Sequence, residues 1–247
     1  MSEEFANQVA FKELSKLEAD FEEVEVEILK YSTKLLKPLY ERRKEVVSKF
    51  DKFWPVAIEQ LGEDLDQYFT PLDGELIESL ESLELDRDET DPRTFTLTFK
   101  FKENQFLETL SLSKTFTYIP KKPMSVEEEE EDSEDITESA RISYKSTPTP
   151  ITWKAGQDLT KTKAGQPPSF FTFFSWVNSD DEGKKDVFEN AHEVAILIAE
   201  ELYPNAVKLF TDALNEEEED DEEEIDLEDE DDDDDEEDEP PKKKSKK

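Results

Sequence analysis

The residues able to do acid–base or nucleophilic chemistry are unevenly supplied in this chain. It holds 68 Asp and Glu residues, a single histidine, His192, and no cysteine. Without cysteine there is no thiolate nucleophile, disulfide framework or Cys/His zinc site, and a Ser-His-Asp triad would have to use His192. Paired carboxylates could act as general acid and base, but no spacing singles out one pair. We therefore expect no catalytic site, no metal site and no cofactor, and His192 is most simply a helix-surface or half-buried histidine.

Glycine and apolar patterning exclude two further classes of protein. The five glycines are scattered singly, so neither a GxGxxG turn nor a phosphate-binding loop can be drawn. The longest purely apolar run, Val194 to Ala199, is far shorter than the roughly 20 residues of a membrane helix. The amino terminus lacks the basic start and apolar run of a signal peptide. We expect a soluble protein made in the cytosol, without nucleotide chemistry or a membrane partner.

The charge balance points to a cationic partner. The formal net charge is -38 at pH 7, and 22 of the 24 residues from Glu216 to Glu239 are acidic. Residues 1–215 still hold 46 acidic and 25 basic residues, a net charge of -21. Because affinity for phosphate comes from Lys and Arg, direct binding to naked nucleic acid is not expected. The acidic tail cannot fold alone, since like charges repel and nothing is available to bury.

A heptad stripe dominates the first fifth of the chain, where residues 4–54 read as one long helix. Apolar residues follow one another at steps of three and four, as in a coiled-coil seam: Leu14, Leu17, Phe21, Val24, Ile28, Tyr31 and Leu35. The stripe could pack on the protein's own body or on a second copy. Antiparallel pairing with a second copy is favoured, because the remaining chain offers no other heptad helix. Pro38 should bend or locally break the helix after Lys37.

The rest of the chain alternates between strand and helix patterns. Residues 94–101 alternate apolar and polar side chains, the repeat of a strand with one buried face. A turn at 102–105 and a second strand to about Phe116 predict an antiparallel meander, with a third strand near 142–153 after an acidic, mobile loop. The segment 169–176 is rich in Phe and is interpreted as core rather than as an aromatic interaction surface. A helix with one broad apolar face is expected over 185–214, kinked near Pro204.

Five segments, in this order, match a known family. The first is Lys37-Pro38-Leu39-Tyr40-Glu41-Arg42-Arg43-Lys44-Glu45-Val46-Val47 with Phe53-Trp54, and the second is Phe95 to Phe101 with Lys114-Thr115-Phe116. The others are Ile151 to Thr160, which fits I-x-W-K-x-G-x-D-L-T, Ser169 to Phe174, which fits S-F-F-x-F-F, and Glu200 to Pro204. Together they resemble the nucleosome assembly protein family. The short amino terminus is similar to the branch of that family that includes SET and vacuolar-sorting-related proteins.

The resemblance implies an α+β fold and a headphone-shaped homodimer. A long dimerisation helix, residues 1–56, would pair antiparallel with its copy through the heptad stripe. Residues 57–214 would form an earmuff domain, an antiparallel β-sheet packed with helices that binds histones, with an acidic loop at about 126–139. Residues 215–239 would be a disordered acidic tail, and 240–247 a basic segment.

The implied function is that of a histone chaperone without enzymatic activity or ATP. Core histones would bind an acidic concave surface and the tail, through these acids: Asp180, Asp181, Glu182, Glu200, Glu201, Glu216, Glu217, Glu218, Glu219, Asp220 and Asp221. Each acid could instead be an ordinary solvated charge, and the tail a solubility device. A second reading is a regulator of a histone-modifying enzyme or a phosphatase, acting through the same acidic dimer.

The final residues reverse the charge abruptly. After Pro240-Pro241, five lysines read as a nuclear-localisation signal: Lys242, Lys243, Lys244, Lys246 and Lys247. They could alternatively fold back onto the acidic run and inhibit it. We expect a nuclear protein that can shuttle through the cytoplasm, with a nuclear import receptor and a histone-modifying enzyme as further candidate partners.

Overall fold

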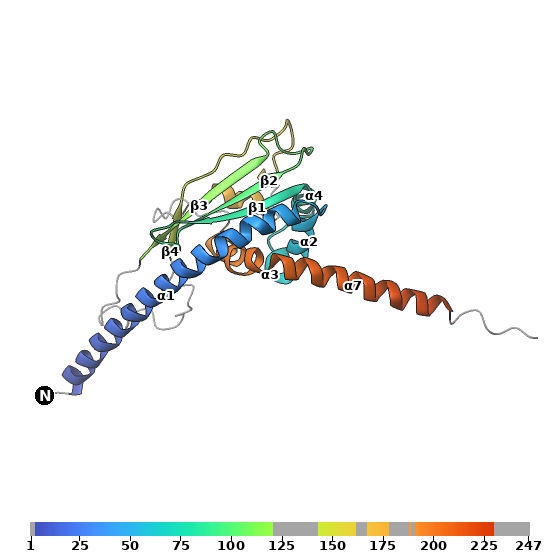
Figure 1. Ribbon diagram of the computed structural model, residues 1–247. Helices are drawn as coiled ribbons and strands as arrows, with labels where there is room; N and C mark the ends of the chain where they lie inside the picture. Colours follow the sequence, from blue (N-terminus) through green and yellow to red (C-terminus); the bar gives the residue numbers. More distant parts are fainter. Residues whose placement is uncertain (1–2, 121–142, 162–166, 178–187, 189–190, 230–247) are drawn as a thin grey trace, which may run out of the picture.

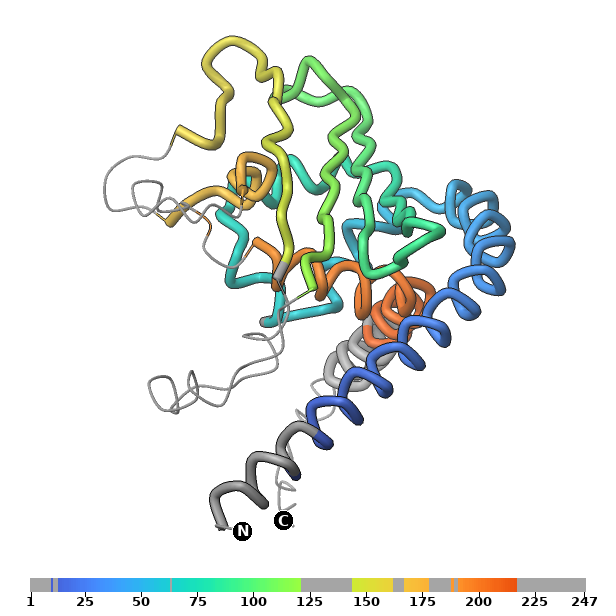
Figure 2. The backbone as a smooth tube through the Cα atoms, turned by 90° about the vertical axis from the view of Figure 1, so that its left-hand side faces the viewer, coloured from blue at the N-terminus to red at the C-terminus, as the bar shows by residue number. Residues whose placement is uncertain are grey.

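The computed structural model describes residues 3–120, 143–161, 167–177, 188 and 191–229. Four strands form one layer, and helical segments on either side of them in the sequence form a second layer beneath the sheet (Figure 1). Helix α1 runs past one edge of this globular body, and its N-terminal half extends beyond it (Figures 1 and 2). We use the term globular body for residues 53–214.

Helix α1 spans Glu3–Val47 without a break, although Pro38 lies inside it. Of the bend or local break expected at Pro38, the break is therefore wrong. Proline removes one backbone donor and strains one turn, but the helix is held on the body on both sides of this position, as described below. It also ends earlier than the predicted residue 54. Lys52 adopts a left-handed conformation, with φ 55° and ψ 20°, and turns the chain into helix α2, Phe53–Glu59.

The turn at Lys52 directs two large side chains into the core. Phe53 and Trp54 are 4% and 3% exposed, whereas a straight continuation of α1 would have left them on the rod. Two short helices follow, α3 at Glu63–Asp66 and α4 at Pro71–Ile77. Helix α4 begins with a capping box, in which the Thr70 hydroxyl accepts from the Asp73 amide and the Asp73 carboxylate accepts from the Thr70 amide.

The sheet is an antiparallel meander with strand order β1-β2-β3-β4. The strands are β1 at Leu80–Arg87, β2 at Phe95–Phe101, β3 at Ser111–Ile119 and β4 at Ser143–Ser146. The alternation predicted for β2 is confirmed, since its Phe and Leu side chains are buried and its Thr and Lys side chains face outward. Strand β1 was not predicted, because a register shift between Leu80 and Ser82 interrupts its two-residue repeat.

The aromatic segment forms the centre of the core, as predicted. Phe170–Ser175 is a 3-10 helix, η1, in which four phenylalanines are at most 1% exposed. Their rings pack beneath the sheet, with Phe99 and Phe174 centroids 5.5 Å apart and Phe116 and Phe173 centroids 5.4 Å apart. The predicted interpretation as core rather than as a surface is therefore confirmed for this segment.

The last helical region is divided by a π-helical turn. Helix α6 spans Ala191–Leu197, the π-helix η2 Ile198–Leu202 and helix α7 Tyr203–Asp229. The irregular turn stands immediately before Pro204, whose ring lacks a donor and would clash with the carbonyl one turn earlier. Helix α7 first packs on α2 and then projects away from the body (Figure 1).

The length of α7 differs from the sequence expectation. Residues 215–239 were expected to be disordered, but the backbone is helical as far as Asp229. A helix that is already packed needs no new nucleus to grow, and glutamate is a good helix former. The acidic tail therefore begins as a helical extension of the globular body.

Candidate interaction surfaces

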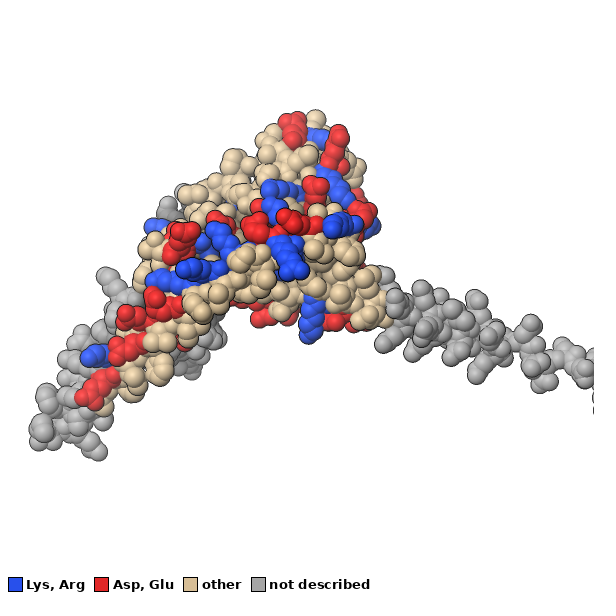
Figure 3. Space-filling view, in the orientation of Figure 1, with Lys and Arg blue, Asp and Glu red and all other residues tan. Residues whose placement is uncertain are grey.

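The heptad stripe of α1, which we call the α1 seam, lies open to solvent. Its seven residues are each between 50% and 66% exposed: Leu14, Leu17, Phe21, Val24, Ile28, Tyr31 and Leu35. No part of the described chain covers them, so packing on the protein's own body is not observed. Uncharged side chains follow the lower edge of α1 in Figure 3. A contiguous apolar stripe of this kind marks a surface for association.

A second face of α1 packs on the globular body, and the sequence reading missed it. Tyr40 is half-buried, with its ring centroid 4.9 Å from that of Tyr203. The Arg43 guanidinium lies 4.6 Å and 4.2 Å from the centroids of these two rings and donates to the Tyr203 carbonyl oxygen. Burial lowers the pKa of Arg43, and the ring faces offset part of that cost. Helix α1 therefore presents opposite faces to the body and to solvent.

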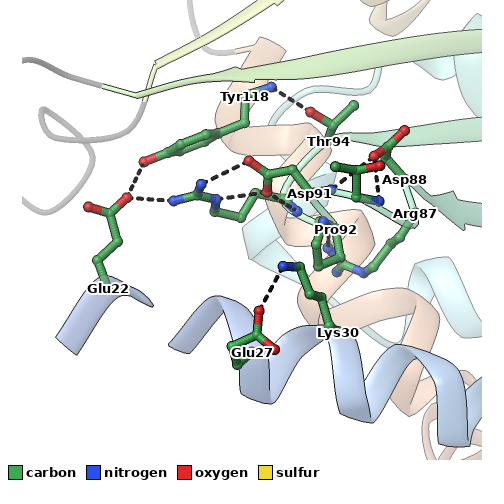
Figure 4. A network of polar contacts seen from close by, with 11 residues as sticks. Glu22, Glu27, Lys30, Arg87, Asp88, Asp91, Pro92, Thr94 and Tyr118 are labelled. Atoms are coloured by element: carbon green, nitrogen blue, oxygen red, sulfur yellow. Dashed lines mark hydrogen bonds and ion pairs between the residues drawn. The ribbon is translucent and has the colours of Figure 1, made fainter. Parts of the chain in front are cut away.

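A polar network fixes the middle of α1 to the sheet (Figure 4). Glu22 on α1 accepts hydrogen bonds from the Arg93 guanidinium at 2.5 Å and from the Tyr118 hydroxyl at 3.0 Å. Arg93 also donates to Asp91 at 2.8 Å and lies 3.8 Å above the centroid of the Tyr118 ring. We call these four residues the α1 brace.

The α1 brace has a clear electrostatic signature. Hydrogen bonding from Arg93 holds the pKa of Asp91 below its usual range, and the same partnership raises the pKa of Arg93. Burial raises the pKa of Tyr118, and its hydrogen bond to Glu22 adds to that effect. Asp91 and Arg93 are thus held in their charged forms and Tyr118 in its neutral form, as the network needs at neutral pH.

Two further ion pairs continue this attachment toward the end of α1. Lys44 lies 2.8 Å from the Glu84 carboxylate on β1, and Lys37 lies 4.0 Å from Glu89 in the β1–β2 turn. Exposed pairs contribute little individually. Together with the half-buried Tyr40 and Arg43 on the same helix face, these ion pairs set the direction in which α1 leaves the globular body.

The structure places three of the predicted histone-contacting acids. Glu200, on η2, lies 2.7 Å from Arg87 and is partly neutralised by it. Glu201 is exposed and accepts from Asn205 at 3.3 Å. Glu216 is exposed on α7 and accepts from Gln60 at 3.0 Å. All three of these glutamates are exposed.

The other predicted contact residues are not placed. Asp180, Asp181, Glu182, the acidic loop 126–139 and the basic segment 240–247 lie outside the described residues. Residues 217–221 belong to the α7 backbone, but their side chains are not described. The roles of these residues stay predictions.

The described residues include neither a metal-binding cluster nor a membrane-spanning helix. No group of three or more His, Asp or Glu side chains among them could hold a metal ion. His192 stacks on Trp176, with centroids 5.9 Å apart, and burial lowers its pKa. Within the described ranges, no helix is long and apolar enough to cross a bilayer.

Comparison with known proteins identifies the family. The model of the nucleosome assembly protein (NAP) family matches residues 48–213. A Schizosaccharomyces pombe protein that carries the family's name is 36% identical over 208 residues, which cover 84% of this chain and 81% of that protein. NAP1-related protein 2 of Arabidopsis thaliana is 31% identical over 228 residues, which cover 84% and 78%.

A solved structure agrees with these relatives. The crystal structure of Ccp1 superposes with a TM-score of 0.69 at 33% identity and covers 83% of this chain and 95% of that one. The chain described here belongs to the nucleosome assembly protein family. The long helix followed by an antiparallel sheet with helices is the fold of these neighbours, so the predicted fold class is confirmed.

Proposed function

We propose that this protein is a histone chaperone that works as a homodimer. Two copies would pair through the α1 seam, and the two globular bodies would carry an acidic surface for core histones. The observation that carries this proposal is the α1 seam itself, seven apolar side chains left open on a helix whose other face is fixed to an acidic body. Membership of the family supplies the class of client.

The electrostatics of the chain support a role in holding histones. Histones carry Lys- and Arg-rich surfaces that meet DNA phosphate in the nucleosome. Mixed freely with DNA, they bind without specificity, because each contact releases counterions. Carboxylates such as Glu201 and Glu216 would compete for the same lysines, and DNA would displace them as the denser polyanion. Histones would thus be shielded and then released without ATP and without a bond being made.

The helical start of the acidic tail refines this mechanism. Helix α7 carries the backbone of the first part of the tail away from the body as far as Asp229. The remaining acids, up to Glu239, would extend the contact by raising the local concentration of carboxylates. The lysines after Pro241 would direct the complex to the nucleus.

The proposal is tested by measuring how histones partition between this protein and DNA. Each core histone pair would be mixed with DNA at near-physiological salt, and soluble histone would be measured as the chaperone is added. We expect histones to remain soluble and nucleosomes to form on DNA at substoichiometric levels of protein. A matched variant would carry Gln at each acid of residues 216–229, which preserves helix propensity. Aggregation unchanged by the native protein would refute the function.

A further inference from the structure

The end of α1 and the edge strand β1 enclose a crevice that plays no part in the proposed function. Its volume is about 240 Å³, and it is lined by α1, α2, the first two strands and Tyr203. Side chains of both charges gather where the end of α1 passes the sheet (Figure 3). We infer that this crevice is a binding site for a single carboxylate group, held between Arg43 and the lysines Lys44 and Lys100. The site is separate from the acids proposed to bind histones.

Arg43 carries a shielded charge without a counterion. No Asp or Glu among the described residues forms an ion pair with it, and its Nη1 donates to the Tyr203 carbonyl oxygen. Its Nη2 is buried and has no hydrogen-bond partner in the described chain. A guanidinium removed from water is normally paired with an anion, because an uncompensated charge is costly in a low dielectric. The Arg43 side chain is therefore suited to receive one.

Aromatic rings replace only part of what Arg43 loses on burial. Its guanidinium carbon lies 4.2 Å from the ring centroid of Tyr203, 4.6 Å from that of Tyr40 and 5.7 Å from that of Trp54. Ring faces attract a cation, but they do not supply the oxygen acceptors that its N–H groups can use. Burial outweighs these contacts, since the pKa of Arg43 is lowered although Tyr203 and Tyr40 act to raise it.

The two lysines of the crevice share one acidic partner. Lys44 lies 2.8 Å and Lys100 lies 2.6 Å from the same oxygen, Oε1 of Glu84. Burial acts to raise the pKa of Glu84, but the hydrogen bonds from Lys100 and Lys44 lower it overall. Each ammonium group has three N–H donors, so this shared contact leaves both lysines with donors for a second carboxylate.

The charge and the size of the crevice define the ligand. Its lining holds three cations and two acids, a net charge of +1: Arg43, Lys44 and Lys100 against Glu81 and Glu84. This small region differs in sign from residues 1–215 as a whole, whose net charge is -21. One carboxylate balances the lining, whereas a phosphate dianion would leave an excess of negative charge. The volume is below the roughly 300–1,000 Å³ of sites for drug-sized molecules, and suits one functional group.

The walls of the crevice strengthen an ion pair formed inside it. Val47, Trp54 and Leu83 line it with apolar surface, and attraction between charges grows as water is excluded. A small rotation of the Arg43 guanidinium toward the crevice would give Nη2 a carboxylate oxygen as acceptor. The second carboxylate oxygen would accept from Lys44. Binding would thus satisfy the donor that the chain alone leaves unpaired.

The carboxylate has two possible sources, a small free organic acid or the Asp or Glu side chain of a protein partner. The acids of the same α7 helix are not a source. Helix α7 runs from Tyr203, beside the crevice, through Glu216 to Asp229. At a rise of about 1.5 Å per residue, the acids from Glu216 onward are held about 20–39 Å from Tyr203 along the helix. The ligand therefore comes from another molecule.

Thermal unfolding of the full chain in sodium acetate tests the site, with sodium chloride at equal ionic strength as the reference. Acetate at ten times its dissociation constant should raise the Tm by about 3–6 °C. The second probe is the peptide Gly-Glu-Gly with both ends blocked. Tighter binding of the peptide than of acetate assigns the site to a protein side chain, and equal or weaker binding assigns it to a small free acid. No stabilisation by either probe overturns the inference.

Two substitutions in the crevice should act in opposite directions, which a general salt effect does not explain. Glu84→Gln removes the competing carboxylate and should tighten acetate binding on the order of tenfold. Lys100→Gln removes a donor and should weaken binding several-fold. Glu103→Gln and Lys49→Gln are the matched controls, because they make the same charge changes at exposed positions outside the crevice. Equal effects of the crevice variants and their controls would contradict the inference.

A third substitution tests the guanidinium of Arg43. Arg43→Lys keeps the positive charge but loses the planar set of donors, so acetate should bind on the order of tenfold more weakly. Circular dichroism establishes that the variant is folded. Unchanged acetate affinity in the folded variant would overturn the role of Arg43. If the variant does not fold, the opposite effects of Glu84→Gln and Lys100→Gln decide the question.

Discussion

The exposure of the α1 seam allows the effect of breaking it to be estimated. Phe21 and Ile28 are each 62% exposed in the single chain. Complete burial of such a side chain stabilises by about 1.5–3 kcal/mol, so pairing still has about 1–2 kcal/mol to gain at each. Four such side chains meet in a dimer. Phe21→Glu/Ile28→Glu should therefore cost about 4–8 kcal/mol of dimerisation free energy, before the repulsion between the new carboxylates is counted.

A loss of this size is easily measured. It corresponds to a dimer that dissociates roughly 10³- to 10⁶-fold more readily. Sedimentation velocity over a range of protein concentrations should show monomers, while circular dichroism shows that the globular body stays folded. Lys16→Glu is the matched control, because it makes the same change in net charge at an exposed position of α1 outside the seam. Dimers of the double variant at micromolar concentration would refute the role of the seam.

Four further predictions concern other parts of the molecule. Arg93→Ala removes the centre of the α1 brace, and distances between spin labels on the two bodies should broaden while the dimer persists. Asp73→Ala leaves the Ser169 hydroxyl and the Phe170 amide unpaired in the core, and should lower the free energy of unfolding in urea by about 3–5 kcal/mol. In the folded protein the pKa of Asp91 lies below its unfolded value of about 3.9. The Asp91 carboxylate therefore stabilises the fold at pH values above the unfolded pKa, and this stabilisation is lost as the pH falls through the folded pKa. Asp91→Asn should flatten this acid dependence, and an equal slope in both proteins would contradict it. Alanine at the lysines of 242–247 should leave a fluorescent fusion in the cytoplasm.

The features that sequence predicted well are those with a clean repeat. The steps of three and four in α1 and the two-residue alternation of β2 each report one buried face, and both elements were found. The dense aromatic segment at 170–175 could be assigned to the core because so much apolar area must be buried. These signals are local, so no knowledge of the tertiary fold was needed.

The features that were missed depend on contacts between distant residues. The α1 brace joins Glu22 to Arg93 and Tyr118, and no spacing along the chain links them. The left-handed Lys52 ended α1 earlier than its apolar pattern suggested. For β1, the register shift after Leu80 hid the alternation that Leu83 and Leu85 would otherwise continue. The second face of α1 could have been found from its own periodicity, with Tyr40 and Val47 among its members.

The central claim is that the folded dimer, and not only its charge, recognises histones. The most direct test is the affinity of the native protein for each core histone pair at near-physiological salt, beside polyglutamate of matched charge and the monomeric Phe21→Glu/Ile28→Glu variant. We predict that the native protein prefers one histone pair and that polyglutamate shows no preference. The monomeric variant should lose most of the native protein's preference. If the native protein bound both histone pairs with equal affinity, and polyglutamate bound them equally well, the claim would be contradicted. The protein would then act only as a general polyanion.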